Sequence, residues 1–436
     1  MNPRQALFTI VILSLAGCQE LDPGPLARVE FANYEVSQRN SNHEITSIIF
    51  HHTPMLSQGF ADSLKQVIHV VIYDADSIPS ILGTLPKLGW IFINESPDLK
   101  AIPASIGSLP ILKFLSIGHT SVSELPQTFR DAKKLKTVYI GQSPASLFES
   151  LTVLPSLQYL SLQGTTDIPD MLPSLPGVIV LGVHGTHELP GIGRLTNLET
   201  LEISGSSAST LPDDVGILTK LKTIRITYHQ TALTIGDGIV PCVGLENLFI
   251  SNNASITLPS RLGDLKSLKT LYVYDSDLET IPESIGGLSS LEVLTIGGTK
   301  VKELPSSIGQ LSTLKTMSIV YSSLEGVPNE IDQLTGLEIL ALNHNSIAVL
   351  PSTIGNLTKL GSLDLTKNEI TEIPPSIGEL VLLRGLGLGD NQLTSLPTAE
   401  MKHLTHLAYL TLGKNQIPKA QVDELKAALP LLKIMD

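Results

Sequence analysis

One short motif recurs sixteen times along this chain, and it constrains the fold more than any other feature of the sequence. The clearest copy begins at Leu337 with LEILALNHNSIAVLP and closes with IGNL before the next copy starts. Successive copies are 20 to 24 residues apart, and from Leu245 to Leu383 the spacing is always 23. A unit this short cannot bury its own apolar side, so neighbouring units must stack on one another. The units start at Val67, Leu88, Leu112, Leu135, Leu157, Val178, Leu198, Leu221, Leu245, Leu268, Leu291, Leu314, Leu337, Leu360, Leu383 and Leu407.

The pattern inside a unit predicts one strand and one irregular return leg. In the clearest copy Leu337, Leu340 and Leu342 point to one interior, and the residues between them alternate outward, as a strand requires. Pro351 cannot donate to a strand ladder and therefore opens the return leg, where Gly355 suits a tight turn. Each strand pairs with the same strand of the next unit, which predicts one long parallel sheet.

These residues resemble the leucine-rich repeat family, whose period is about 20–29 residues. The variant Leu304-Pro305-Ser-Ser-Ile308-Gly309-Gln-Leu311 is similar to the Ras-group members of plants and animals. The resemblance implies an α/β repeat solenoid, a horseshoe with a parallel sheet on its concave face and irregular or 3-10 segments on its convex side. Sixteen strands about 4.8 Å apart would give an inner arc of roughly 75 Å.

The ninth position of each unit, an asparagine in that family, departs from the pattern in most units. Five units keep asparagine, namely Asn253, Asn345, Asn368, Asn391 and Asn415. Nine others have Ser or Thr, which satisfy turn backbone groups more weakly, so we expect the N-terminal half to be less regular. His229 occupies this position in the stretch from Tyr228 to Gly244, which lacks a clean Leu-Pro ending and where we expect a local irregularity.

The first residues of the chain are typical of a signal peptide. A short positive start is followed by an apolar stretch and then by small residues. Leu15-Ala16-Gly17-Cys18 resembles the bacterial lipoprotein box, which implies cleavage before Cys18, lipidation of Cys18 and export. Gln19 in place of aspartate implies the outer rather than the inner membrane. The alternative is an unmodified Cys18 and a cytosolic signalling scaffold resembling the Ras-group proteins.

This organisation divides the chain into five segments. We expect a signal peptide over 1–17, a tether and the start of an N-terminal cap over 18–45, and the rest of that cap over 46–66. The repeat array follows over 67–418. The segment 419–436 has helical spacing from Lys419 to Leu429 and then an edge segment, which predicts a C-terminal cap.

Composition and motifs argue against several classes of function. A net charge of −13 disfavours nucleic acid as a partner. Cys18 and Cys242 cannot form a disulfide framework or a thiolate zinc site, and Cys242 is interpreted as a small buried residue. No phosphate loop, nucleophile elbow or zinc-protease motif occurs. The sequence therefore predicts no enzyme, no cofactor and no metal site.

The outward positions of the strand, which are the third, fifth, seventh and eighth of each unit, hold twelve of the 19 aromatic residues. Tyr and Trp dominate binding hot spots, so this concave face is the predicted site for a protein partner, with a glycan as the alternative ligand. Simple cross-strand packing would also place aromatics there. Two clusters are expected, one around Tyr73, Trp90, Phe92 and Phe114, and one around Tyr228, Phe249, Tyr272 and Tyr274 flanked by Arg225 and Asp275. The other candidate contact residues are Tyr139, Tyr159 and Tyr321.

Overall fold

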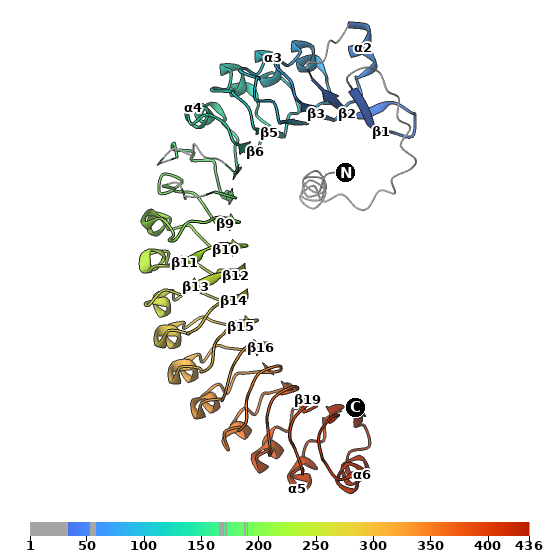
Figure 1. The fold of residues 1–436 in the computed structure, drawn as a ribbon, viewed down its shortest axis with the longest axis vertical. Coiled ribbons are helices and arrows are strands. Elements are labelled where there is room, and N and C mark those ends of the chain that lie inside the picture. Colours follow the sequence, from blue (N-terminus) through green and yellow to red (C-terminus); the bar gives the residue numbers. More distant parts are fainter. Residues whose placement is uncertain are drawn as a thin grey trace.

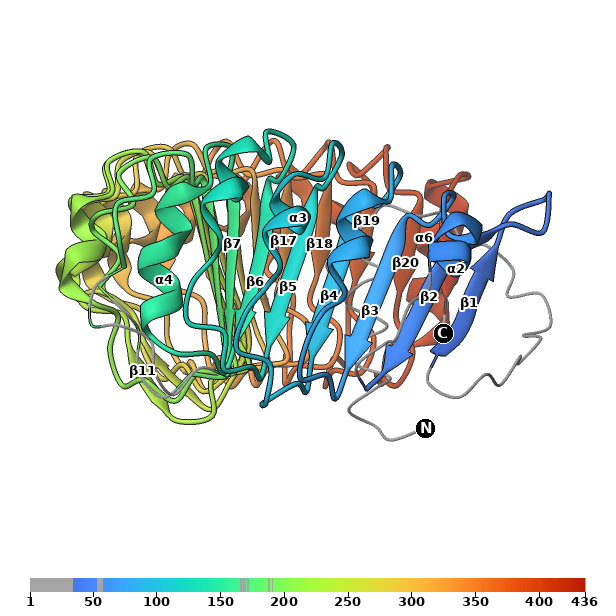
Figure 2. The same cartoon turned by 90° about the horizontal axis from the view of Figure 1, so that it is seen from above.

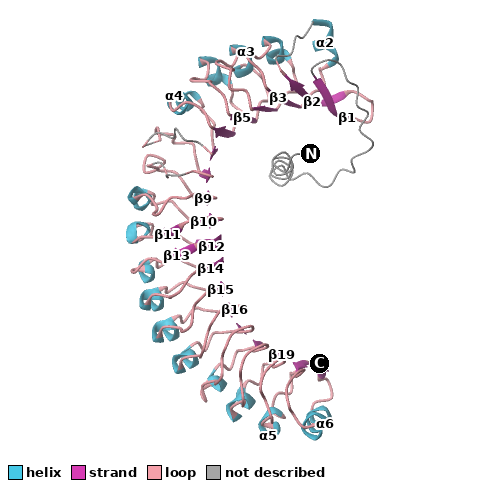
Figure 3. Cartoon of the chain, viewed as in Figure 1, coloured by secondary structure: helices cyan, strands magenta, loops and turns pink. Residues whose placement is uncertain are grey.

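The computed structural model describes residues 34–52, 58–164, 170, 172–186, 189 and 191–435. The chain forms an open arc with the strands on its inner side and the short helices on its outer side (Figure 1 and Figure 3). The predicted fold class, a leucine-rich-repeat solenoid, is confirmed. The segment that holds the lipoprotein box and Cys18 lies outside the described residues.

Each of the sixteen units contributes one strand, and every strand begins two residues after the start of its unit. Figure 2 shows the strands of the first units side by side, seen from above. The strands are β3 (His69–Tyr73), β4 (Trp90–Asn94), β5 (Phe114–Gly118), β6 (Thr137–Gly141), β7 (Tyr159–Gln163), β8 (Val180–His184), β9 (Thr200–Ser204), β10 (Thr223–Thr227), β12 (Asn247–Asn253), β14 (Thr270–Ser276), β15 (Val293–Gly297), β16 (Thr316–Val320), β17 (Ile339–Ala341), β18 (Ser362–Asp364), β19 (Gly385–Gly387) and β20 (Tyr409–Thr411).

The strands pair in parallel and in register, so equal positions of neighbouring units face each other. Phe249, for example, pairs with Arg225 on one side and with Tyr272 on the other. The interior positions form one continuous core, in which Leu337, Leu340 and Leu342 are almost completely buried. An in-register sheet therefore lines up the outward residues in rows along the concave face.

The convex side consists of short helices. The α-helices here are α3 (Ala104–Gly107), α4 (Ser146–Ser150) and α5 (Thr398–Met401). The 3-10 helices are Ser80–Thr84, Gln127–Asp131, Leu151–Val153, Asp213–Ile217, Asp237–Ile239, Leu262–Asp264, Glu283–Gly287, Ser306–Gln310, Asn329–Gln333, Ile354–Asn356 and Pro375–Glu379. Many of them follow the Leu-Pro step, because proline fixes the backbone of the residue that precedes the helix and removes its hydrogen-bond donor.

Each end of the sheet is extended by an additional element. At the N-terminal end β1 (Tyr34–Arg39) pairs antiparallel with β2 (Ile45–His51), which pairs parallel with β3, and α2 (Gln58–Ser63) follows β2. At the C-terminal end α6 (Lys419–Ala428) is followed by β21 (Lys433–Met435), which pairs with β20. Leu425 of α6 is fully buried, so this helix covers the last unit of the core.

The backbone turns sharply where each strand ends. The eighth residue of all sixteen units has a positive φ, and four of these residues are glycines. Left-handed backbone costs an ordinary L-residue roughly 1–2 kcal/mol, and Asn, Asp and Gly tolerate it best. Tyr228 and Tyr321 adopt it nevertheless, with φ of 55° and 49°. Both tyrosines are also exposed on the concave side.

The stretch around His229 departs from the regular unit, as expected. A second, two-stranded parallel sheet forms there from β11 (Ala232–Thr234) and β13 (Ser255–Thr257). The buried His229 ring replaces the usual asparagine, and its Nε2 lies 2.7 Å from the Ala208 carbonyl oxygen. The irregularity is therefore an ordered second sheet in which the imidazole satisfies a backbone acceptor of the preceding unit.

The ninth-position asparagines and hydroxyls are bonded differently. The Asn345 amide donates to the carbonyls of Ile319 and Leu342, at 2.7 and 2.9 Å, and its oxygen accepts from the Leu324 N–H. Thr186 at the same position has a buried hydroxyl with no hydrogen-bond partner in the described part of the chain. Asparagine thus joins neighbouring units through more bonds than this threonine does.

Alternating charges follow one edge of the sheet. The second residues of seven consecutive units are Glu199, Lys222, Glu246, Lys269, Glu292, Lys315 and Glu338. Each lysine contacts the glutamate of the preceding unit, with Nζ to Oε2 distances of 2.9, 3.0 and 2.8 Å. We call this series the edge charge ladder.

Candidate functional site

Four aromatic rings form a continuous zigzag across β4, β5, β6 and β7. The ring centroids of Phe92 and Phe114 are 4.7 Å apart, those of Phe114 and Tyr139 5.1 Å, and those of Tyr139 and Tyr159 5.6 Å. The contacts run diagonally because Ser116, the residue directly opposite both Phe92 and Tyr139, is small. We call Phe92, Phe114, Tyr139 and Tyr159 the aromatic row.

The first predicted cluster is divided in the structure. Phe92 and Phe114 belong to the aromatic row, whereas Trp90 contacts the His69 ring at 4.8 Å and Tyr73 stacks on His51 at 5.8 Å. Phe92 is only 5% exposed, because neighbouring side chains cover its ring on the concave side. It therefore supports the row and offers a partner little surface.

A polar link continues the aromatic row toward the second predicted cluster. The Tyr159 hydroxyl lies 3.4 Å from a Glu202 carboxylate oxygen, although β8 lies between their strands. The residue of β8 at this level is Gly182, and a Cβ there would lie 3.3 Å from the Tyr159 hydroxyl and 2.7 Å from His184 Nε2. A glycine thus leaves room for the tyrosine to reach over one strand.

The link ends on the second cluster. Glu202 Oε1 lies 3.7 Å from Arg225 Nε, and the Arg225 guanidinium lies 4.5 Å from the centre of the Phe249 ring. Phe249 then contacts Tyr272 at 6.2 Å, and Tyr272 stacks on Tyr274 at 5.8 Å. The two clusters that the sequence separates are therefore one continuous band from β4 to β14, which we call the concave band.

The environment of the tyrosines changes their acidity. Burial raises the pKa of Tyr159, and the nearby Tyr139 and Glu202 raise it further. Burial, followed by the Asp275 carboxylate, raises the pKa of Tyr274. Both phenols therefore stay protonated at neutral pH and can donate a hydrogen bond to a partner.

The exposed tyrosines lie at the ends of their strands. Tyr228 is 60% exposed and Tyr321 is 52% exposed. Tyr321 stacks on His344, with ring centroids 3.9 Å apart. The structure thus places Tyr228 and Tyr321 where a partner can reach them, at the rim of the concave face.

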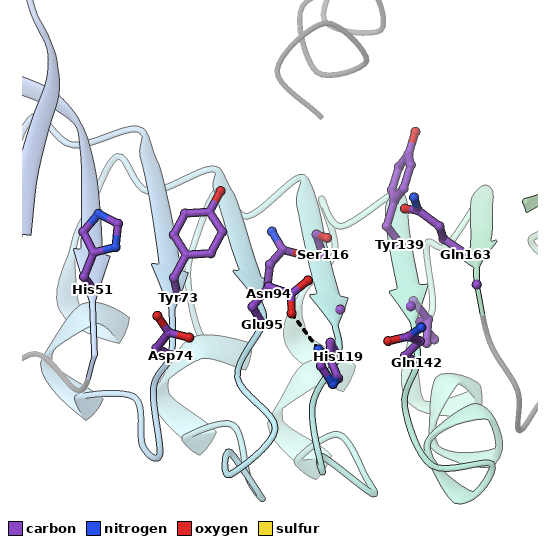
Figure 4. Close-up of a pocket in the computed structure, with 14 residues that line it drawn as sticks. His51, Tyr73, Asp74, Asn94, Glu95, Ser116, His119, Tyr139, Gln142 and Gln163 are labelled. Carbon is purple, nitrogen blue, oxygen red and sulfur yellow. Dashed lines mark hydrogen bonds and ion pairs between the residues drawn. The ribbon is translucent and has the colours of Figure 1, made fainter. Parts of the chain in front are cut away.

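A polar trough lies beside the aromatic row, between β2 and β7. Its volume is about 610 Å³, and Figure 4 shows its lining side chains. Tyr73 and Tyr139 rise from it, and Gly118 and Gly141 leave its floor without side chains. A Cβ at Gly118 would lie 2.7 Å from the Asn94 side-chain oxygen. We call this cavity the trough, and it is additionally lined by His51, Asp74, Asn94, Glu95, Ser116, His119, Ile140, Gln142, Gln163 and Gly164.

Sequence reasoning identified only Tyr73 and Tyr139 among the residues of the trough. The missed signal was a pair of glycines, Gly118 and Gly141, at the seventh position of two successive units. Two missing side chains on neighbouring parallel strands leave a depression on the face of a sheet. Glu202 was also missed as the link to the second cluster, although it occupies the fifth position next to Arg225.

Several other kinds of site have no support within the described residues. They contain no group of three or more His, Cys, Asp or Glu side chains that could hold a metal ion. None of their helices combines the length and the apolar character needed to cross a bilayer. Cys242 is fully buried, its Sγ donates to the Val215 carbonyl oxygen at 3.3 Å, and burial raises its pKa to about 11. The prediction that Cys242 is a small buried residue is therefore confirmed.

The comparisons with known proteins agree with the fold. A family model described as a leucine-rich repeat region matches residues 252–344, and a second leucine-rich repeat model matches residues 358–417. The chain is a leucine-rich repeat protein. Disease resistance protein RGA5 of Oryza sativa subsp. japonica is 27% identical over 146 residues, which are 32% of this chain and 13% of that protein. This chain therefore spans a small part of that relative's length.

Solved structures share the solenoid over most of the chain. A leucine-rich repeat protein of Leptospira interrogans matches 88% of this chain and 93% of its own, at 24% identity and a TM-score of 0.52. The ectodomain of an Arabidopsis thaliana membrane receptor kinase, solved in complex with CASPARIAN STRIP INTEGRITY FACTOR 2, matches 90% of this chain and 50% of its own, at 23% identity and a TM-score of 0.53. The Drosophila Toll–Spätzle complex matches 86% of this chain and 58% of its own, at 17% identity and a TM-score of 0.61. Proteins with this fold are typically non-catalytic and commonly mediate protein–protein binding.

Proposed function

We propose that this chain is a non-catalytic binding protein that recognises a protein partner on its concave face. The observation that carries the proposal is the concave band, in which aromatic rings, Glu202 and Arg225 form a connected series of contacts from β4 to β14. Tyrosine and arginine are enriched in binding hot spots because they combine a large contact area with polar groups. The fold comparisons support the same class of function, since the plant receptor ectodomain and Toll are both solved with protein ligands.

The band also suits a partner because it is already organised. Ring–ring contacts and the Arg225–Phe249 contact hold the side chains in place, so fewer rotamers have to be fixed on binding. Apart from Phe92, the rings of the band are partly exposed, so each keeps some surface for a partner. This arrangement favours a folded or extended protein segment that lies along the arc.

We further propose that the protein works outside the cytoplasm, attached to a bacterial membrane through lipid on Cys18. The basis is the lipoprotein box of the sequence, since multiple acyl chains on one residue anchor a protein stably. Labelled palmitate fed to a bacterial host expressing the full chain tests it. We expect label and membrane association in the native chain and loss of both in Cys18→Ala. An unlabelled native chain would contradict the anchor and favour the cytosolic scaffold.

The binding proposal can be tested without knowing the partner in advance. A photo-crosslinking amino acid in place of Tyr272 should form a crosslink to one defined protein in the cells that produce this chain. The same amino acid in place of Ser306, on the convex side, should not. The affinity of that partner is then measured with Tyr272→Ala/Tyr274→Ala. We expect at least about a tenfold loss, in keeping with the loss of a hot spot.

A matched control exists in the same sheet. Tyr409 is a concave tyrosine of the last unit that contacts Lys433, outside the concave band. Tyr409→Ala should leave the affinity unchanged. An equal loss of affinity in both variants, or no loss in either, would overturn the assignment of the band as the binding surface. Binding of oligosaccharides to the band, without a protein partner, would favour the glycan alternative.

A further inference from the structure

We propose that the trough between Tyr73 and Tyr139 accepts an arginine or lysine side chain of the protein partner. The inference rests on the proposed function, because it assigns one specific contact on the same concave face. It is carried by the trough's charge, by the unpartnered side-chain amide of the largely buried Asn94 and by the two aromatic walls.

The trough carries two carboxylates and no lysine or arginine. Asp74 and Glu95 occupy the eighth positions of adjacent units, and the Asp74 N–H donates to the Glu95 carbonyl oxygen at 3.0 Å, which holds the two strand ends together. Glu95 contacts His119 Nδ1 at 2.7 Å, as Figure 4 shows. Asp74 has no ion pair within the described residues, and the lining contains no Lys or Arg. A cationic group from a partner would complete this arrangement.

A buried amide points to the same kind of ligand independently of the carboxylates. Asn94 is 9% exposed and lines the trough. Its side chain makes no hydrogen bond within the described part of the chain, and its oxygen lies over the glycine floor at Gly118. The Asn94 amide opens onto the trough, so its oxygen can accept a hydrogen bond from a donor placed there. A guanidinium or ammonium group supplies only donors.

The walls of the trough favour a cation with a long stem. The Tyr73 and Tyr139 rings stand at its two sides (Figure 4), where a guanidinium can lie against an aromatic face. Small-molecule sites usually measure about 300–1,000 Å³, and the trough falls in that range. It can therefore hold one long side chain together with part of the peptide that carries it.

The test uses two blocked tripeptides and the full chain. The probe is acetyl-Gly-Arg-Gly-amide, and its matched neutral analogue carries citrulline, which keeps the shape of arginine without the charge. Binding is followed by titration in an NMR experiment that observes the trough residues. We expect saturable binding of the arginine peptide and at least about fivefold weaker binding of the citrulline peptide, because hydrogen bonds to charged groups are the stronger ones.

Two substitutions remove the charges with little change in shape. Asp74→Asn and Glu95→Gln should each weaken the arginine peptide at least about fivefold, and asparagine tolerates the left-handed backbone of position 74. The matched control is Asp390→Asn, which changes the same residue type at the same repeat position outside the trough. That variant should bind the peptide as the native chain does.

The outcomes separate this inference from the proposed function. Equal binding of both peptides, absence of binding, or equal loss in Asp390→Asn would overturn the assignment of the trough to a basic side chain. Binding of chitohexaose at the trough in place of the peptides would overturn it as well. The crosslinking test at Tyr272 concerns residues outside the trough, so its result does not depend on whether the peptide binds the trough.

Discussion

The hydroxyl of Tyr159 lies 3.4 Å from the carboxylate of Glu202, two units along the array. This contact joins residues from β7 and β9 across β8, whose residue opposite Glu202 is Gly182. It connects the aromatic row to Arg225 and so turns two groups of aromatic residues into one surface. A partner that touches one end of the concave band therefore meets a surface of fixed geometry along several units.

The first prediction concerns the acidity of Tyr159. Glu202 is one of the groups that raise the pKa of this phenol, after burial and Tyr139. Glu202→Gln removes the negative charge, so the pKa of Tyr159 should fall toward its ordinary value. The measurement is the phenolate absorbance as the pH is raised, with Tyr159→Phe used to identify the signal. Glu338→Gln on the edge charge ladder is the control, and an identical shift there would contradict the contact.

The second prediction separates support from recognition within the concave face. Phe92→Ala should lower the free energy of unfolding by about 3 kcal/mol, because the buried ring leaves a cavity. Tyr272→Ala should cost less than about 1.5 kcal/mol, because this ring is only half-buried, yet it should weaken partner binding more. Urea unfolding measures the first quantity for both variants. The interpretation is wrong if Tyr272→Ala proves the more destabilising of the two.

The third prediction compares two residues at the ninth position. Asn345→Ala leaves partly buried carbonyls and the Leu324 N–H without the partners they now have, so we expect a loss of about 1–3 kcal/mol in unfolding free energy. Thr186→Val removes a buried hydroxyl that has no partner among the described residues, so it should be neutral or stabilising. Thermal melts of the two variants test the difference. A Thr186→Val variant as unstable as Asn345→Ala would show that its hydroxyl is bonded in solution.

The fourth prediction concerns acid. Burial lowers the pKa of His69, His184 and His229 below the ordinary value of 6.5. The unfolded chain therefore binds more protons than the folded one once the pH falls below about 6.5, and stability is lost as the pH drops further. Urea midpoints should fall between pH 7 and pH 5, which lies above the usual range of the carboxylates. His69→Gln should reduce the slope, and an unchanged slope would count against burial as its cause.

The fifth prediction concerns Cys242. Its thiol is buried and its pKa is raised to about 11, so little thiolate forms at pH 8 and little of it is accessible. A maleimide reagent should leave Cys242 of the folded Cys18→Ala chain unmodified over hours and label it rapidly in urea. Mass spectrometry measures the extent of labelling. Fast labelling of the folded protein would show that this unit opens in solution.

Much of the fold could be predicted from the sequence because the same pattern of apolar residues recurs in every unit. Each unit start, from Val67 to Leu407, precedes its strand by two residues. The helix expected from Lys419 is α6, and the loose stretch around His229 is the site of the second sheet. These features depend on local periodicity and on the chemistry of single residues, which a sequence displays directly.

The candidate site was harder to predict because it depends on which way side chains lean across the sheet. The structure divides the group of Tyr73, Trp90, Phe92 and Phe114, since Tyr73 stacks on His51 and lines the trough. The trough and the Tyr159–Glu202 link both arise where a glycine replaces a side chain, at Gly118, Gly141 and Gly182. Such gaps become visible only when neighbouring units are placed side by side.

The edge charge ladder restricts how the number of units can change during evolution. Glutamate and lysine alternate from Glu199 to Glu338, so duplication of any single unit in this stretch, or loss of a single interior unit, would place two like charges next to each other. Loss or duplication of two units keeps every glutamate beside a lysine. Within these units the array can therefore gain or lose neighbouring pairs of units and keep the alternation of glutamate and lysine. Related arrays are expected to differ here by an even number of units.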